Sequence, residues 1–309
     1  MKVFLTVVAI LITNLNIYGQ ALYTKTFGNP KDKALIFLHG GPGYNAINFE
    51  YSTADILSKQ GFYVIVYDRR GEGRSVDTSA KFTFQQSFED IQVILNKLKV
   101  KNVTLLGHSF GGVIACLFTE KYPKLINKLI LIGAPIIIQE TFNTIITSSK
   151  VIYESKGDKN NLGYLDILDK MDKKSLEYSS YCFGHAMQNG FYLPKKMTEE
   201  AKNIYNHLKM DTVVKKYASQ MSYESSKGFW LNEKYSSINL TNSINNILKM
   251  EVPVYGIYGK DDGLYSLNQI EYLEMLITTK NLKYIDNCSH NAFIDQQNQF
   301  IEAIIKWMN

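Results

Sequence analysis

Short apolar runs alternate with amphipathic stretches over residues 21–135, and this alternation restricts the fold more than any other feature of the chain. The runs have the length and composition of strands that are buried on both faces of a parallel sheet. They are Ala34–Leu38, Tyr63–Tyr67, Val103–Leu106 and Lys128–Ile132. Between them, apolar residues at helical spacing predict a helix over 88–98 and another over 112–122, which ends before Pro123. Alternating strands and helices predict an α/β fold in which helices flank a mostly parallel sheet.

The pattern changes in the middle of the chain. Residues 137–250 are rich in Lys, Tyr, Asn and Ser, and their apolar residues recur at helical spacing. Strand signals resume at Pro253–Tyr258 and Leu282–Ile285, and an amphipathic helix runs from Phe293 to Trp307. Residues 137–250 form a segment that is too long for an unstructured loop in a compact domain. We therefore expect a helical cap over 137–250. The α/β core then consists of two segments, 20–136 and 251–309.

The N-terminal residues form an apolar segment of a different kind. Lys2 precedes an apolar run from Val3 to Ile12, and small and polar residues follow up to Gly19. One positive charge, a short apolar stretch and a small residue before the cleavage site are typical of a signal peptide. A spanning helix needs about 20 apolar residues, about twice what this run contains. We therefore expect removal of residues 1–19, export to the periplasm or the medium, and no membrane insertion of the mature chain.

Charge and cysteine content exclude several classes of function. Lys and Arg number 34 against 29 Asp and Glu, and the net charge of +5 is too small to indicate nucleic-acid binding. Cys116, Cys182 and Cys288 are an odd number without zinc-site spacing, so at least one thiol stays unpaired within the chain. The sequence contains no metal-ligand cluster, phosphate-binding loop or dinucleotide-binding motif, so no cofactor is expected. A small molecule or short peptide is the expected substrate.

Residues 107–111 read GHSFG and match the pattern G-x-S-x-G. They follow the predicted strand Val103–Leu106 and precede a predicted helix, which is the context that a nucleophile elbow requires. Flanking glycines leave room for the tight turn. The helix N-terminus behind Ser109 favours developing negative charge. The pattern therefore predicts Ser109 as the catalytic nucleophile.

A serine hydroxyl becomes a good nucleophile when a base takes its proton. The chain has five histidines, and His290 lies just after the last predicted strand, Leu282–Ile285. Loops at the carboxyl ends of strands form the site in open α/β sheets. We therefore expect His290 to be the base, with His108 held inside the elbow and His39 in another loop.

The base needs a carboxylate to fix its tautomer. Chains with this elbow place the acid between the serine and the histidine, after the penultimate strand. That loop reads GKDDG at 259–263 and offers Asp261 and Asp262. The spacing G-x-x-D favours Asp262 as the third member of the catalytic triad. Asp261 stays open as an alternative, and Asp286 is a weaker one.

The loop after the predicted strand Ala34–Leu38 reads HGGPG at 39–43. H-G-G loops supply one backbone N–H group to the oxyanion hole, and the residue after the nucleophile supplies the other. The expected donors are therefore Gly41, with Gly40 as the alternative, and Phe110. The glycines allow the backbone to approach the reacting carbonyl group.

With these motifs the chain resembles the α/β-hydrolase family over essentially all of its mature length. HGGPG at 39–43 and DRRGEGRS at 68–75 are similar to the motifs of the proline iminopeptidase group, and GHSFGG at 107–112 forms the elbow. The resemblance implies an α/β-hydrolase fold with a helical cap inserted between late strands. It implies a structural role for Asp68 and Arg70, which would hold a loop in place.

The resemblance also implies a function. It points to a serine hydrolase of the aminopeptidase type that works through an acyl-enzyme. Members of the group hold the free amine of the substrate with acidic cap residues, and Glu224 falls where such a residue is expected, with Glu177 and Glu154 as alternatives. The elbow is more similar to that of esterases, so an esterase or other small-molecule hydrolase is the alternative. A slow-turnover ligand sensor of the same fold is an alternative of another class.

Overall fold

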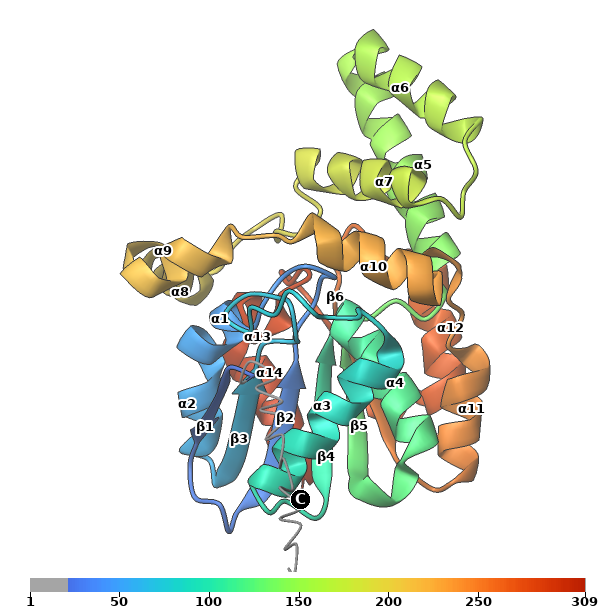
Figure 1. Cartoon of the computed structure of the whole chain (residues 1–309). Coiled ribbons are helices and arrows are strands. Elements are labelled where there is room, and N and C mark those ends of the chain that lie inside the picture. Colours follow the sequence, from blue (N-terminus) through green and yellow to red (C-terminus); the bar gives the residue numbers. More distant parts are fainter. Residues whose placement is uncertain (1–21, 309) are drawn as a thin grey trace, which may run out of the picture.

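The computed structural model describes residues 22–308, which form a seven-stranded sheet with helices on both faces (Figure 1). The strand order is β1-β3-β2-β4-β5-β6-β7. Neighbouring strands are parallel except for β1 and β3. The strands are β1 Thr24–Phe27, β2 Lys33–Leu38, β3 Phe62–Tyr67, β4 Val103–His108, β5 Ile126–Ile132, β6 Val254–Gly259 and β7 Leu282–Ile285. The expected α/β fold is confirmed, and so are the six strands expected within it.

The sequence analysis missed β1, a short antiparallel strand at the edge of the sheet. Its sequence is TKTF, and each of its residues is exposed or half-buried. It therefore lacks the apolar run by which the central strands are recognised. Its partner β3 is buried along its whole length.

Successive residues of the central strands pack into two separate cores, because side chains alternate between the faces of a sheet. In β2, Ile36 and Leu38 belong to one core, and Leu35 and Phe37 belong to the other. The first core is covered by α3 Phe84–Lys97, α4 Phe110–Lys121, α11 Thr241–Lys249 and α12 Leu267–Ile277. The second core is covered by α1 Ile47–Phe49, α2 Asp55–Ser58, α13 Ala292–Asp295 and α14 Gln297–Met308.

The connection between β5 and β6 is helical, as expected for residues 137–250. It contains α5 Ile138–Lys156, α6 Lys159–Asp169, α7 Leu176–Gln188, α8 Glu199–Met210, α9 Thr212–Ala218, α10 Tyr223–Glu233 and α11. In Figure 1, α10 crosses above the sheet while α5, α6 and α7 extend beyond it. The last of these helices, α11, places Ile244 and Ile247 in the same core as Ile114 of α4. We use the name cap for α5 to α10, and the domain boundaries themselves stay a prediction.

The predicted signal peptide, residues 1–19, lies outside the described residues, so export stays a prediction. Across residues 22–308, no helix combines the length and the apolar character needed to cross a membrane. The three cysteines are all buried and free.

Candidate active site

Ser109 sits in a strained turn between β4 and α4. Its φ of 52° and ψ of −125° lie outside the regions that ordinary residues occupy. The turn is held from both sides, because the N–H of Ser109 donates to the carbonyl of Ile132 at 2.9 Å and its carbonyl accepts from the N–H of Gly112 at 2.9 Å. The neighbouring strand β5, which contains Ile132, and helix α4 therefore fix the backbone that carries the hydroxyl.

The glycines of the elbow are required by close packing. A Cβ atom on Gly111 would lie 2.1 Å from the carbonyl oxygen of Leu38, and one on Gly112 would lie 2.3 Å from Cβ of Ala134. Neither contact is possible without moving backbone or a packed side chain. The pattern GHSFGG thus allows α4 to start directly against β2 and the end of β5.

His290 and Asp262 meet at the carboxyl end of the sheet. Nδ1 of His290 donates to Oδ2 of Asp262 at 2.8 Å, and both side chains are buried. Asp262 comes from the loop after β6, where its Oδ1 also accepts the N–H of Leu264 at 3.1 Å. The bond at Nδ1 leaves Nε2 of His290 free to take a proton.

The other two candidate acids have different partners. Asp261 accepts the backbone N–H of Lys195 at 3.1 Å. Asp286 pairs with Lys260 at 2.9 Å on the surface. Of the three aspartates considered from the sequence, only Asp262 bonds to His290.

Buried groups around His290 hold its loop, and the sequence analysis did not single them out for this role. The ring of His108 lies 4.8 Å from that of His290, and its Nε2 is 3.1 Å from the carbonyl of His290. Burial lowers the pKa of His108, so the ring is neutral and Nε2 donates to that carbonyl. Asp295 accepts the N–H of Ser289 at 2.8 Å and the hydroxyl of Tyr205, from α8, at 2.9 Å. Burial raises the pKa of Asp295 to about 6.

The HGGPG loop lies next to the elbow. A Cβ atom on Gly40 would be 3.1 Å from Cβ of Ser109, and Gly41 has a φ of 116°. Phe110 is the first residue of α4, and the N–H of a first helical residue has no partner inside its helix. Gly41 and Phe110 come from separate elements and line one small space together with Ser109.

A cavity of about 520 Å³ opens onto Ser109 and His290 between the core and the cap. Among residues 22–308, no Asp, Glu, Lys or Arg lines it. Its walls are Gly40, Gly41, Pro42, Tyr44, Asn48, His108, Ser180, Phe183, Met187, Tyr192, Met221, Ser222, Tyr223, Ser226, Tyr235 and Asn291. The cavity therefore offers hydroxyl, amide and aromatic groups but no fixed charge.

A small apolar recess continues from Ser109 on the side of Phe110. Ile138, Phe183, Tyr235 and Leu264 are among the residues that line it, whereas His290 does not. The two spaces thus differ in their access to the imidazole ring.

The acidic residues expected to hold a substrate amine lie away from this cavity. Glu224 is exposed on the first turn of α10, although its neighbour Tyr223 lines the cavity. Glu177 and Glu154 are also exposed. The structure brings Ser109, Asp262, His290, Gly41 and Phe110 together, but it does not bring Glu224 to them.

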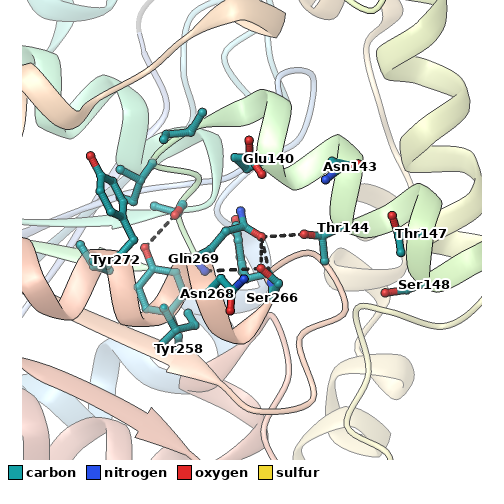
Figure 2. Close-up of a pocket in the computed structure, with 16 residues that line it drawn as sticks. Glu140, Asn143, Thr144, Thr147, Ser148, Tyr258, Ser266, Asn268, Gln269 and Tyr272 are labelled. Carbon is teal, nitrogen blue, oxygen red and sulfur yellow. Dashed lines mark hydrogen bonds between the residues drawn. The ribbon is translucent and has the colours of Figure 1, made fainter. Parts of the chain in front are cut away.

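A second cavity of about 460 Å³ separates α5 of the cap from α12 of the core (Figure 2). The hydroxyl of Thr144 donates to Oε1 of Gln269 at 2.7 Å across this junction, and the N–H of Ser266 donates to the same oxygen at 2.8 Å. Neither Ser109 nor His290 lines it. We therefore place the candidate active site in the first cavity. Within the described chain, no group of three His, Cys, Asp or Glu side chains could hold a metal ion.

The family described as alpha/beta hydrolase fold matches residues 33–297. The chain belongs to this family. The α/β hydrolase is 25% identical to a proline iminopeptidase of Saccharolobus solfataricus, over 95% of this chain and 90% of the relative. It is 22% identical to a proline iminopeptidase of Lactobacillus helveticus, over 94% and 95% of the two chains.

Solved structures share the fold of this α/β hydrolase. A proline iminopeptidase-related protein from Thermus thermophilus has a TM-score of 0.64 and 22% identity, covering 92% of this chain and 91% of that one. An esterase from Exiguobacterium antarcticum has a TM-score of 0.60 and 20% identity, covering 93% and 94%. The resemblance to the proline iminopeptidase group is confirmed at the level of family and fold, and the chain is a hydrolase.

Proposed function

We propose that this α/β hydrolase is a serine hydrolase that cleaves small uncharged esters through an acyl-enzyme. Ser109 is the nucleophile, His290 the general base and acid, and Asp262 the group that orients His290. The N–H groups of Gly41 and Phe110 bind the oxyanion. The observation that carries this proposal is the cavity: Ser109 and His290 line it together, and its other described walls carry no fixed charge.

The chemistry follows from this arrangement. Oγ of Ser109 attacks the ester carbonyl carbon while Nε2 of His290 takes its proton, and the two N–H groups stabilise the negative oxygen. The intermediate collapses, the alcohol leaves with the proton from His290, and the acyl group stays on Ser109. Water then attacks the acyl-serine with His290 again as base, and the acid is released.

We assign the alcohol and acyl parts of the ester to the two spaces beside Ser109. His290 must protonate the leaving alcohol, so the alcohol lies in the large cavity, which His290 lines. The acyl group then enters the apolar recess beside Phe110, which His290 does not line. Ile138 and Leu264 line this recess, and its volume of about 20 Å³ favours a short acyl chain.

An uncharged cavity argues against a substrate with a free ammonium group near the reacting bond. Moving an ammonium ion out of water without a counter-charge costs several kcal/mol. Glu224 would have to enter the cavity to supply that charge, and it is exposed on α10. Esters without charge carry no such cost.

Aminopeptidase activity of the proline iminopeptidase type is the second candidate. Two observations favour it: the HGGPG loop and the proline iminopeptidases that match over at least 90% of both chains. In this function Glu224 would hold the amine after a shift of the first turn of α10. A slow-turnover ligand sensor would be distinguished from both enzymes by its low turnover number.

The test is hydrolysis of p-nitrophenyl acetate, p-nitrophenyl octanoate and proline p-nitroanilide by the purified protein and its Ser109→Ala variant. We expect repeated turnover of the acetate, slower turnover of the octanoate, no cleavage of the anilide, and loss of all activity in the variant. Fast anilide cleavage that is lost in the variant would replace the ester proposal with the aminopeptidase. An active Ser109→Ala variant would overturn the serine mechanism, and a single turnover without release would indicate the sensor.

A further inference from the structure

The loop after β3 contains a buried ion pair that the proposed mechanism does not use. The side chains of Arg69 and Glu72 are 2% and 0% exposed, and Nη2 of Arg69 lies 2.7 Å from Oε2 of Glu72. Burying two opposite charges is a poor source of stability, because desolvation cancels most of their attraction. The contacts of the pair therefore need an explanation beyond stability.

Arg69 holds the peptide group that carries the proposed oxyanion donor. Nη2 of Arg69 donates to the carbonyl of Gly40 at 2.5 Å, and Nη1 donates to the carbonyl of His39. The peptide bond between Gly40 and Gly41 has the ordinary trans form, in which the C=O and N–H groups point in opposite directions. Because Arg69 holds the carbonyl on its own side, the N–H of Gly41 points away from Arg69.

The same guanidinium group also lies against the second proposed donor. Its Cζ is 5.5 Å from the centre of the Phe110 ring, within the range of a cation–π contact. Arg69 thus contacts the carbonyl of Gly40, which belongs to the same peptide group as the Gly41 N–H, and the ring of Phe110. It does not line the cavity, so it acts on them from behind.

Glu72 joins the oxyanion loop to the cap. Its Oε1 accepts the N–H of Gly43 at 3.0 Å and the hydroxyl of Ser225, on α10. Two further bonds tie the same loop to the start of α10: the N–H of Ser222 donates to the carbonyl of Gly43 at 2.8 Å, and the hydroxyl of Ser226 donates to the carbonyl of Pro42 at 3.0 Å. One carboxylate therefore contacts Arg69, the loop and the cap at once.

We propose that Arg69 and Glu72 are positioning residues that set the Gly41 N–H of the oxyanion hole and couple its orientation to the seating of α10. This inference rests on the proposed function, because it assigns a cause to the geometry of the proposed oxyanion hole. When α10 is seated, Ser225 and Gly43 share one oxygen of Glu72, and Glu72 in turn fixes the guanidinium that holds Gly40. When α10 lifts, Glu72 loses one partner and the peptide is held less firmly.

Ser225→Ala is the main test variant, because it removes the contact to the cap while the buried ion pair remains. Asn232→Ala is the matched control: Nδ2 of Asn232, also on α10, donates to the carbonyl of Lys81 at 2.8 Å and has no part in the cavity. Glu72→Gln tests the carboxylate itself. Arg70→Gln is its control, because Arg70 lies in the same loop but pairs with Asp77 and Asp90.

The measurements are kcat and KM for p-nitrophenyl acetate, the inhibition constant of phenylboronic acid, and the melting temperature. A boronic acid forms a tetrahedral adduct with the serine and places an oxygen in the oxyanion hole, so its affinity reports on transition-state binding. Ser225→Ala removes a hydrogen bond to a charged group, so we expect kcat and boronate affinity each to fall roughly tenfold. For Glu72→Gln we expect roughly a hundredfold, as for loss of an oxyanion donor.

In both test variants KM should change less than twofold, because the substrate itself touches neither residue. The controls should keep kcat and boronate affinity within about twofold even where their melting temperatures fall. The inference is overturned if Ser225→Ala behaves like Asn232→Ala, or if the loss lies in KM alone. Failure of the proposed function has a different signature: the parent protein then neither turns over the ester nor binds the boronate through Ser109.

Discussion

Asp262 accepts a hydrogen bond from Nδ1 of His290 at 2.8 Å, whereas its neighbour Asp261 accepts one from the backbone N–H of Lys195 at 3.1 Å. Two adjacent carboxylates of one loop thus have different partners. Only the first can fix the tautomer of His290, in which Nε2 is free to accept the proton of Ser109.

Asp262→Asn should therefore lower kcat for p-nitrophenyl acetate by about 10⁴-fold, because an amide favours the wrong tautomer of the histidine. Asp261→Asn makes the same change in size and charge as Asp262→Asn, one residue away. We expect it to alter kcat less than threefold (about 0.6 kcal/mol). Circular dichroism of both variants checks that the fold is kept. A larger loss in Asp261→Asn than in Asp262→Asn would contradict the proposed triad.

The sequence predicted those parts of the fold and site that are determined locally. The buried strands carry continuous apolar runs, and the elbow needs Gly111 within two residues of Ser109, so both can be recognised without the structure. Asp262 was favoured by its spacing in one loop. The edge strand β1 was missed because its residues are polar and partly exposed.

The remaining features depend on contacts between distant segments. Glu72 meets Ser225 across 153 positions of the chain, and Tyr205 meets Asp295 across 90. No local pattern encodes such pairs. The place of Glu224 could not be predicted for the same reason, because it depends on how α10 lies over the sheet.

Gly111→Ala should destabilise the protein strongly. The new Cβ atom would lie 2.1 Å from the carbonyl oxygen of Leu38, so β2 and α4 must move apart. We expect a loss of about 3 kcal/mol or more in the free energy of unfolding, as for other overpacked cores.

Gly184→Ala is the control for this substitution. Gly184 lies within α7, and a Cβ atom there would meet nothing within 4 Å. Alanine should stabilise that helix by about 0.5–1 kcal/mol. Urea unfolding of both variants measures the difference, and equal midpoints would show that the elbow tolerates a methyl group.

The buried carboxyl group of Asp295 should make the stability of the protein depend on pH. Burial raises its pKa from 3.8 to about 6, so the folded chain binds this proton more tightly than the unfolded chain does. The free energy of unfolding therefore falls as the pH rises through the window between these two values. The contribution of Asp295 is present below about pH 4 and is lost, by about 3 kcal/mol, above about pH 6.

Asp295→Asn removes this proton but leaves the other carboxylates in place. The difference in unfolding free energy between parent and variant, measured in urea from pH 4 to pH 8, isolates the effect of Asp295. We expect the parent to lose stability relative to the variant as the pH rises. Parallel profiles would mean that Asp295 is ionised equally in the folded and unfolded chains.

Glu224 separates the two candidate functions. If an amine is bound, Glu224→Gln removes its counter-charge, and KM for proline p-nitroanilide should rise by about 10–100-fold while ester hydrolysis is unchanged. Glu200→Gln is the matched control, because Glu200 is exposed on the first turn of α8, was not a candidate for amine binding and does not line the cavity. For the uncharged ester that we propose, neither variant should change kcat or KM for p-nitrophenyl acetate more than twofold, and neither should act on the anilide. A selective loss of anilide cleavage in Glu224→Gln would show that the first turn of α10 turns its carboxylate into the cavity when an amine is present.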